Sequence, residues 1–442
     1  MDIFPGRLYQ EREIESKEGL REVVAIESNK CFRCGNTDVQ LFGKMSCALC
    51  KREDCIYCRN CIVMGRVNSC QKLYYQHARL LLETKEVLLR WEGALSAGQR
   101  KASNAIVVNL KAKTDMLLWA VAGSGKTEMM FEGMDWALRQ GFRICVASPR
   151  VDVCLELLPR LKEAFPSIDI VCLYGDSKDN YQGEHFVIAT THQLIRFYEA
   201  FQVIFIDEVD AFPYAKDPFF FFFEYAVMKA RTKEGSTIII TATPEKKWQE
   251  ECVRGKRNFV KIPGRYHRKK LPVPRTCWIG PWKKNLAKGK ITPKLIQWMN
   301  DVKKKDQPAL IFFPEIDAMN KFANALENKG YASPVTVHSA DELRKEKVEW
   351  LRKGKIKLLL TTTILERGVT FTDVQVAVFG SEARIFTEAA LVQISGRAGR
   401  KLSHPTGDVC FFHYGKTIEM KQAISHIQKM NQQGVIEGML DD

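Results

Sequence analysis

The segment Ala120–Thr127 constrains the fold of this chain more than any other stretch, because it has the composition of a phosphate-binding loop. The apolar run Met116–Trp119 precedes it and predicts a buried strand, and the residues that follow, 128–139, carry apolar side chains at helical spacing. Backbone N–H groups in a loop between a strand and a helix N-terminus point at phosphate groups. An ordinary strand-to-helix turn is the alternative, and the Lys126-Thr127 pair argues against it.

The chemistry of a nucleotide site is visible in this loop and in an acidic segment further along. Lys126 is expected to reach the β- and γ-phosphates, and the Thr127 hydroxyl to ligate Mg²⁺. A second apolar strand, 203–206, leads into Asp207 and Glu208. Asp207 is predicted to hold Mg²⁺ through water, and Glu208 to orient and deprotonate the attacking water. Gln99 precedes the loop and has the amide needed to read adenine.

Strands and helices alternate after the loop, which predicts a parallel, doubly wound sheet with ligands beyond the carboxyl ends of its strands. The expected strands end in short polar segments, which we interpret as the rim that contacts nucleic acid. The residues predicted for this rim are Pro149, Arg150, Gly175, Thr190, Thr191, His192, Thr241, Thr243, His338, Thr362 and Thr363.

The second half of the chain repeats the alternation and ends in the segment 391–400. Arg397 and Arg400 are three residues apart at a helical end, and they suit stabilisation of charge on a transferring γ-phosphoryl group. Arginines on a different domain from the phosphate-binding loop would make hydrolysis depend on domain closure.

Eight of the fourteen cysteines fall between Cys31 and Cys70, which predicts a structural zinc region. The predicted ligands are Cys31, Cys34, Cys47, Cys50, Cys55 and Cys58, with Cys61 and Cys70 as further candidates. The first four can share one zinc and the last four a second. Alternatively, Cys55 and Cys58 pair with Cys31 and Cys34 and leave Cys47 and Cys50 spare. Basic residues around the cysteines, Arg33 among them, suit either DNA contact or a solvated face.

Charge and hydropathy favour a polyanionic partner and a cytoplasmic location. The 442 residues carry a formal net charge of +15, and nucleic acid is the first candidate partner. Residues 252–300 contain no Asp or Glu, and we interpret them as a basic linker whose aromatic residues, Tyr266, Trp278, Trp282 and Trp298, stack on bases. A solvated linker is the alternative. No apolar run reaches membrane-spanning length.

Two further segments have a pattern that predicts helix. Apolar residues between 71 and 91 recur at helical spacing. The run Phe219–Phe223 is interpreted as buried helix packing.

Taken in order, these segments resemble the motif set of superfamily 2 helicases and translocases, including the Ala120 that replaces the first loop glycine. The resemblance implies two RecA-like doubly wound parallel-sheet domains, 95–275 and 276–442, after a small N-terminal zinc-binding region within 1–94. It adds Gln393 to the catalytic residues Lys126, Thr127, Asp207, Glu208, Arg397 and Arg400. It implies an ATP site formed by Gln99, Ala122, Gly123, Ser124, Gly125, Lys126, Thr127 and Gly368.

The segments 207–213, 393–400 and 58–66 together closely resemble the ComFA family of competence proteins. That resemblance implies a DNA-stimulated ATPase that uses ATP, Mg²⁺ and Zn²⁺ and helps to bring single-stranded transforming DNA into Gram-positive bacteria. It also implies partnership with ComFC and the ComEC channel at the inner face of the membrane. A homo-oligomeric ring suits such a role, although no residue requires one.

Two other hypotheses compete with a DNA translocase. The segment 393–400 and the cysteines also resemble the primosomal helicase PriA, which would make the chain a replication-restart or repair helicase. PriA is longer, however, and its zinc region interrupts the motor. The third hypothesis is a zinc-dependent DNA-binding adaptor in which ATP acts as a switch.

Overall fold

The computed structural model describes residues 2–441 except 79, 82–85, 87, 211–218, 367–370 and 401, and it also leaves out the side chains of residues 63 and 219–221. Two compact units result: residues 1–95, 100–118 and 127–260, and residues 96–99, 119–126 and 261–442. Gly368, assigned above to the ATP site, lies outside the described residues.

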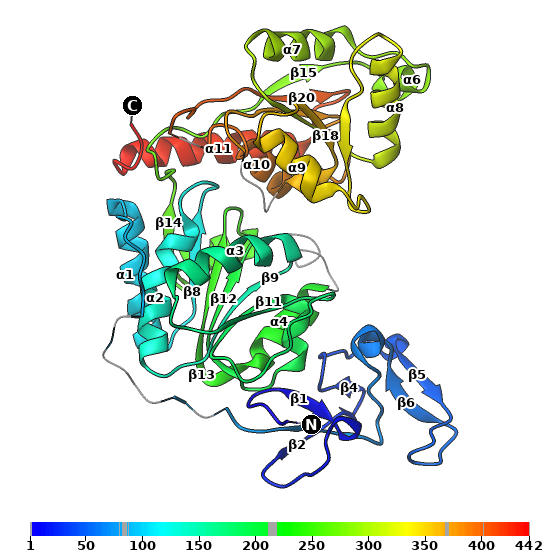
Figure 1. Ribbon diagram of the computed structural model, residues 1–442, viewed down its shortest axis with the longest axis vertical. Coiled ribbons are helices and arrows are strands. Elements are labelled where there is room, and N and C mark those ends of the chain that lie inside the picture. The colour runs from blue at the N-terminus through cyan, green and yellow to red at the C-terminus, as the bar shows by residue number, and fades with distance from the viewer. Residues whose placement is uncertain are drawn as a thin grey trace. The chain divides into compact units, whose positions relative to one another are not determined.

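The N-terminal region is built from short strands and 3₁₀ turns (Figure 1). A three-stranded sheet has the order β1-β7-β2, and there are two hairpins, β3-β4 and β5-β6, with Cys31 in β4 and Cys55 and Cys58 in β6. The elements are β1 (Leu8–Gln10), η1 (Glu11–Glu13), β2 (Arg21–Val24), β3 (Ile26–Glu27), β4 (Lys30–Cys31), η2 (Val39–Leu41), β5 (Phe42–Met45), β6 (Cys55–Cys58), η3 (Arg59–Met64) and β7 (Lys72–Tyr75).

The helix predicted between residues 71 and 91 is wrong. Lys72–Tyr75 is strand β7, which pairs antiparallel with both β1 and β2, and the described residues between 76 and 95 contain no helix. Leu73, Tyr74 and Tyr75 are buried. Pairing with two strands from the start of the chain therefore overrides the local helical spacing.

The first large sheet has seven strands in the order β10-β11-β9-β12-β13-β8-β14. Neighbours from β10 to β13 are parallel, and β9, β10 and β11 are buried throughout. The elements are α1 (Ala97–Lys111), β8 (Met116–Ala120), α2 (Lys126–Arg139), β9 (Ile144–Ser148), α3 (Val151–Ala164), β10 (Ile170–Leu173), β11 (Phe186–Thr190), η4 (Thr191–Arg196), β12 (Phe201–Asp207), α4 (Phe219–Ala230), β13 (Arg231–Thr241), α5 (Lys246–Val253) and β14 (Asn258–Ile262).

The second large sheet has six strands in the order β15-β20-β19-β16-β18-β17, and every neighbouring pair is parallel. The predicted fold class, two doubly wound parallel sheets after a cysteine-rich region, is confirmed. The elements are β15 (Arg275–Trp278), α6 (Trp282–Ala287), α7 (Pro293–Lys304), β16 (Ala309–Phe312), α8 (Ile316–Glu327), β17 (Val335–Val337), α9 (Arg344–Arg352), β18 (Leu358–Thr361), η5 (Thr363–Leu365), β19 (Gln375–Phe379), α10 (Glu388–Ser395), β20 (Val409–His413) and α11 (Ile418–Ile436).

The basic segment 252–300 is not the linker we expected, because β14, β15, α6 and the start of α7 lie within it. Trp282 and Trp298 are 3% and 4% exposed and belong to the core of the second unit. Their indole N–H groups donate to Glu382 and Asp408, each at 2.6 Å. These two rings therefore do not stack on bases. Trp278 and Tyr266 are exposed.

Candidate nucleotide site and cysteine centres

The phosphate-binding loop has the backbone that its sequence predicts. It joins β8 to α2, and both Gly123 and Gly125 have a positive φ, 79° and 78°. Residues with a Cβ rarely adopt this conformation, which explains the glycines. Lys126 and Thr127 form the first residues of α2.

Gln99 contacts the loop, although the sequence suggested a different use for its amide. Its Nε2 donates to the Ser124 carbonyl at 2.9 Å, and its Oε1 accepts from the Ser96 N–H at 2.9 Å. Gln99 is 6% exposed. The amide therefore ties the start of α1 to the loop, and adenine reading stays a prediction.

The acidic segment stands at the carboxyl end of β12, two strands from β8 in the sheet order. Asp207 is the last residue of β12 and is buried. Glu208 has a φ of 58°, so the chain turns sharply as it leaves the strand. The Thr243 hydroxyl donates to the Asp210 carboxylate, and the Thr243 N–H donates to Thr241 Oγ1 at 3.0 Å. The segment 241–243 is thus bonded directly to the acidic segment.

The segment 393–400 begins in the last turn of α10 and continues beyond its end, in the second unit. Gln393 and Arg397 are 2% and 1% exposed. Arg397 Nε donates to the Glu366 carbonyl at 2.9 Å, and Arg400 Nε to the Gly396 carbonyl at 3.1 Å. Arg265, which sequence reasoning missed, donates to the carbonyls of both Gly396 and Gly399. Its only signal in the sequence was its place in the basic stretch.

The residues predicted to contact nucleic acid stand at or just beyond the carboxyl ends of parallel strands. In the first unit, Pro149 and Arg150 follow β9, Gly175 follows β10, Thr190 ends β11, and Thr191 and His192 begin η4. In the second unit, His338 follows β17, and Thr362 and Thr363 follow β18. The His192 ring packs at 4.7 Å on the ring of Phe223, and burial lowers its pKa.

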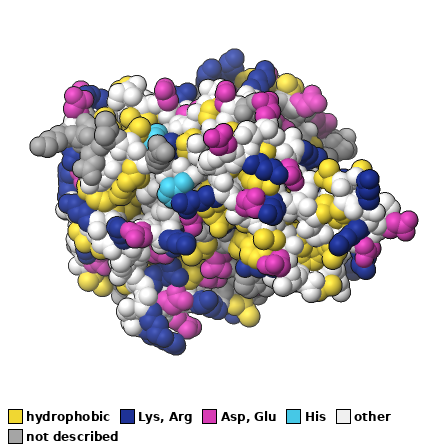
Figure 2. Space-filling view, turned by 90° about the horizontal axis from the view of Figure 1, so that it is seen from below, with side chains coloured by type: hydrophobic (Ala, Val, Ile, Leu, Met, Phe, Trp, Pro, Cys, Tyr) yellow, Lys and Arg dark blue, Asp and Glu magenta, His cyan; other side chains and the backbone are white. Residues whose placement is uncertain are grey.

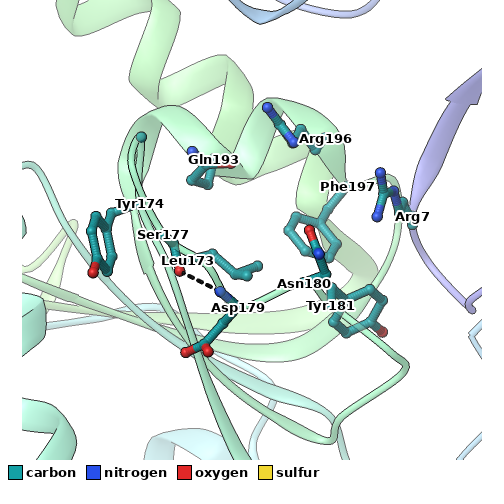
Figure 3. Close-up of a pocket in the computed structure, with 11 residues that line it drawn as sticks. Arg7, Leu173, Tyr174, Ser177, Asp179, Asn180, Tyr181, Gln193, Arg196 and Phe197 are labelled. Carbon is teal, nitrogen blue, oxygen red and sulfur yellow. Dashed lines mark hydrogen bonds between the residues drawn. The ribbon is translucent and has the colours of Figure 1, made fainter.

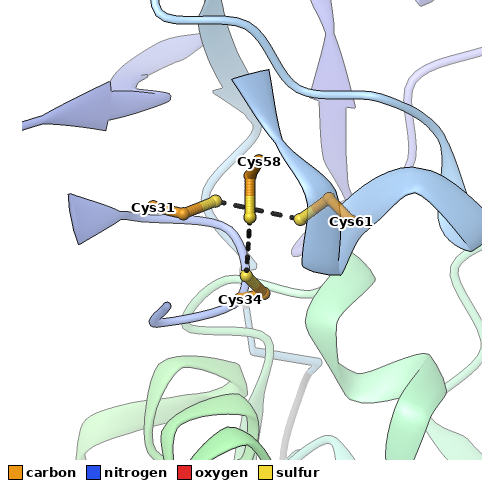
Figure 4. Close-up of side chains that lie close together, drawn as sticks. All are labelled: Cys31, Cys34, Cys58 and Cys61. Atoms are coloured by element: carbon orange, nitrogen blue, oxygen red, sulfur yellow. Dashed lines mark hydrogen bonds between the residues drawn. The ribbon is translucent and has the colours of Figure 1, made fainter. Parts of the chain in front are cut away.

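The eight N-terminal cysteines form two groups of four. Cys31, Cys34, Cys58 and Cys61 make one, the inner centre (Figure 4), and Cys47, Cys50, Cys55 and Cys70 make the other, the outer centre. Within each group all sulfur atoms lie within 4.8 Å of one another. Both pairings that we considered from the sequence are therefore wrong in part, because each kept Cys55 and Cys58 together.

The strand β6 explains this separation. Cys55 and Cys58 stand at its two ends, and an extended strand rises about 3.3 Å per residue, so their backbones lie roughly 10 Å apart. Cys31–Cys34 and Cys47–Cys50 are instead tight turns, closed by N–H bonds from Gly35 to Cys31 O and from Lys51 to Cys47 O. These two Cys-x-x-Cys pairs each share a centre, as do Cys58 and Cys61, whereas Cys55 and Cys58 do not.

Both groups have the dimensions of a zinc–thiolate tetrahedron. Bonds of about 2.3 Å from zinc to sulfur imply a sulfur–sulfur distance of roughly 3.8 Å. The observed distances are 3.8 Å for Cys31–Cys61, 3.6 Å for Cys34–Cys58, and 3.7 Å for both Cys47–Cys70 and Cys55–Cys70. N–H groups of Cys50 and Leu49 lower the pKa of Cys47 to about 6, which favours the thiolate that metals bind. Each group can therefore hold one Zn²⁺ in a closed, structural site.

The inner centre is packed against the first parallel-sheet domain through α4. Tyr225 Oη donates to the Phe32 carbonyl at 2.9 Å, and a Cβ on Gly35 would lie 2.4 Å from the Tyr225 ring. Lys229 Nζ donates to the carbonyls of Arg33 and Ile195, at 2.7 and 2.5 Å. Lys229 thus links two segments: the turn Cys31–Cys34, which provides two of the cysteine ligands, and the end of η4.

Arg33 and Lys229 are both buried and donate to backbone carbonyls, a role that the sequence did not predict for either residue. Arg33 is 6% exposed, and its guanidinium donates to the carbonyls of Met64 and Gly65, so it is no DNA contact. Burial lowers the pKa of Lys229 to about 7, Arg33 acts in the same direction, and nearby thiolates oppose it. A lysine in α4, which is apolar apart from Tyr225 and the exposed Glu224, was the available signal.

Comparison with known proteins agrees with this architecture. Three family models match: "Competence protein ComFA N-terminal domain" over residues 6–75, "Type III restriction enzyme, res subunit" over 92–246, and "Helicase conserved C-terminal domain" over 288–401. Among solved structures, yeast Dbp5 bound to RNA and ADP BeF3 has a TM-score of 0.54 at 15% identity and covers 79% of this chain and 93% of its own. RecG bound to a three-way DNA junction has a TM-score of 0.52 at 17% identity, with coverages of 79% and 47%.

Fold and motifs define a superfamily 2 helicase-like ATPase. Competence protein ComFA of Bacillus subtilis is 45% identical over 91% of this chain and 86% of its own length. Competence protein ComFA of Streptococcus pneumoniae is 36% identical over 97% and 98%. The chain belongs to the ComFA family. In the described part of the chain, no helix has the length and apolar character to cross a membrane.

Proposed function

We propose that this competence-related ATPase moves along single-stranded DNA and drives the uptake of transforming DNA. The observation that supports the proposal best is the place of the polar residues that follow β9, β10 and β11. These three strands are parallel neighbours, so Arg150, Gly175 and Thr191 gather at one edge of the sheet. That edge is where ligands of doubly wound sheets bind.

The ATP-dependent part of the proposal rests on named residues. Lys126 would bind the β- and γ-phosphates, Thr127 and Asp207 would hold Mg²⁺, and Glu208 would orient the attacking water. Gln393, Arg397 and Arg400 would stabilise the negative charge that develops on the transferred γ-phosphoryl group. The hydrogen bonds of Thr243 to Thr241 and Asp210 link the rim to the acidic segment that also carries Asp207 and Glu208.

The remaining parts of the proposal concern location and partners. Uptake at the membrane would place the protein at its cytoplasmic face, with ComFC and the ComEC channel as partners and a ring of copies as one arrangement. On the face shown in Figure 2, Lys and Arg side chains lie among Asp and Glu side chains rather than in one block.

The test is steady-state ATP hydrolysis at fixed salt with no nucleic acid, single-stranded DNA, duplex DNA or RNA. Fixed salt is essential because a basic protein binds any polyanion at low ionic strength. We expect strong stimulation by single-stranded DNA, lost in Glu208→Gln and kept in Glu163→Gln, a control on the exposed face of α3. Equal rates with and without nucleic acid would contradict the proposal and favour the adaptor hypothesis.

Movement and uptake need separate measurements. Displacement of a protein block from the end of a single strand, with no separation of a duplex, would support translocation without unwinding. Lys126→Ala should abolish both this displacement and the transformation of cells. Normal transformation with Lys126→Ala would contradict a motor role.

A further inference from the structure

A pocket in the first unit brings together segments that are far apart in the sequence (Figure 3). Its volume is about 80 Å³. Arg7 comes from the N-terminal region, Tyr174, Ser177 and Asn180 from the segment after β10, and Gln193 and Arg196 from η4. None of the residues assigned above to ATP or zinc lines it.

Two arginines give this pocket an uncompensated positive charge. Among the described residues, neither the Arg7 nor the Arg196 guanidinium forms an ion pair, and the buried Nε of Arg196 has no hydrogen-bond partner. Burial lowers the pKa of Arg196, repulsion by Arg33 and Arg7 adds to this effect, and Glu13 opposes it. A half-buried cation without a partner costs free energy, which an anion in the pocket would offset.

The remaining polar groups do not neutralise the two arginines. Asp179 also lines the pocket, but in Figure 3 its carboxylate points away from Arg7 and Arg196. Its backbone N–H donates to Ser177 Oγ at 3.1 Å. Gln193 and Asn180 carry amide groups that can donate to an oxygen anion.

The local backbone holds Arg7 in place. Arg7 pairs with Phe197 in an antiparallel bridge, directly after the last residue of η4. Tyr181 Oη donates to the Pro5 carbonyl at 2.8 Å and accepts from Arg143 at 2.9 Å. The positions of Arg7 and Arg196 are therefore coupled, which distinguishes this pocket from two mobile surface side chains.

The position of the pocket indicates the class of its ligand. It lies beside the carboxyl ends of β10 and β11, since Leu173 ends β10 and η4 follows β11. Gly175 lines it, and Gln193 follows His192, so it adjoins two segments of the proposed rim. The pocket lies at the end of the row of residues that we propose to contact a nucleic-acid strand. The simplest anion to occupy it is therefore the next backbone phosphate of that nucleic-acid strand.

We propose that this pocket binds a backbone phosphate of a nucleic-acid strand through Arg7 and Arg196, extending the strand path from the parallel sheet onto the N-terminal region. The proposal rests on the proposed function of the same rim. It assigns a role in strand binding to a residue that precedes the cysteines.

The experiment measures the affinity of the full chain for oligothymidylates of increasing length, at several salt concentrations. Affinity of the unsubstituted protein should rise in a step once the strand reaches the pocket. Arg7→Gln and Arg196→Gln should each remove this step and weaken binding of long strands by about tenfold. The slope of log K against log salt should fall by about 0.7 for each lost phosphate contact.

The control variants separate a phosphate contact from other effects. Arg21→Gln removes the same charge from an exposed position on β2 and should keep the length step. Arg196→Lys retains the charge and should restore part of the affinity, which excludes a folding defect as the cause. Equal length dependence and salt slope in Arg7→Gln and the unsubstituted protein would overturn the proposal.

Two further outcomes have distinct meanings. Saturable binding of inorganic phosphate that needs Arg196, with no length step for DNA, would assign the pocket to a free anion and overturn the strand assignment. Stimulation of ATP hydrolysis by short strands tests the proposed function independently, because short strands do not reach the pocket. Stimulation by short strands, without a length step in binding, would refute the role of this pocket and leave the proposed function standing.

Discussion

The inner and outer cysteine centres each consist of four cysteines, yet they differ in what surrounds them. Cys31, Cys34, Cys58 and Cys61 are all 0% or 1% exposed and form part of a hydrophobic cluster with Leu73 and Tyr75. In the outer centre, Cys50 is half-buried and Cys70 is exposed. The inner centre serves as the core of the N-terminal region, whereas the outer one closes a loop at its edge.

Contacts with the first parallel-sheet domain add to this difference. Tyr198 and Phe222, both from that domain, pack against the cluster that contains the inner centre. The Tyr75 and Tyr198 rings lie 4.5 Å apart. Loss of the inner centre should therefore also destabilise the first parallel-sheet domain. Loss of the outer centre should change only the structure of the loop around it.

The largest effect is expected from Cys61→Ser. This change removes a ligand of the inner centre, and closure of a structural zinc site supplies roughly 10 kcal/mol or more to folding. We expect one zinc per chain instead of two, a large loss of soluble protein, and weaker DNA-stimulated hydrolysis in the remainder. Zinc analysis and circular dichroism measure this. Unchanged zinc content would refute the assignment of the inner centre.

Lys229→Met should have the next largest effect. Methionine fits the apolar α4 but leaves the carbonyls of Arg33 and Ile195 without their donor, at a cost of about 2 kcal/mol in the free energy of unfolding. Urea unfolding measures this, with zinc content expected to stay at two. Lys233→Met, at an exposed position, is the matched control. Equal stability of the two variants would show that the inner centre is not anchored by this lysine.

Cys70→Ser tests the outer centre and should change much less. We expect loss of one zinc, faster proteolysis around residues 47–55, and a much smaller loss of stability in the rest of the first unit than Cys61→Ser causes. ATP hydrolysis should keep its response to single-stranded DNA. A loss of activity as large as that of Cys61→Ser would abolish the distinction between the centres.

The smallest effect concerns acid, which also releases zinc by protonating thiolates. Burial lowers the pKa of His185 to about 4, with Arg143 acting in the same direction. The unfolded chain therefore binds a proton between about pH 6.5 and 4 that the folded chain does not, and stability falls as the pH falls through this range. His185→Gln should flatten the dependence of the melting temperature on pH in this window. An unchanged pH dependence of the melting temperature would show that the acid sensitivity comes from the cysteine centres rather than from His185.

The sequence was sufficient to place those residues of the candidate nucleotide site that are adjacent in the chain. Gly123–Thr127 and Asp207–Glu208 each lie in one strand-to-loop transition, so their positions followed from local pattern. Contacts between residues that are distant in the chain were harder to predict from the sequence. The ligand sets of the two centres depend on the extended geometry of β6, and Trp282 and Trp298 are buried by strands and helices that their own spacing did not reveal.

The interleaved ligand sets have a consequence for biosynthesis. Cys31, Cys34, Cys47 and Cys50 leave the ribosome before Cys58 and Cys61, although they belong to two different centres. A metal ion captured at that moment would join four early thiolates in a non-native site. Maturation would then require ligand exchange, in which the late cysteines displace early ones, and the timing of zinc delivery would decide how much nascent chain becomes trapped.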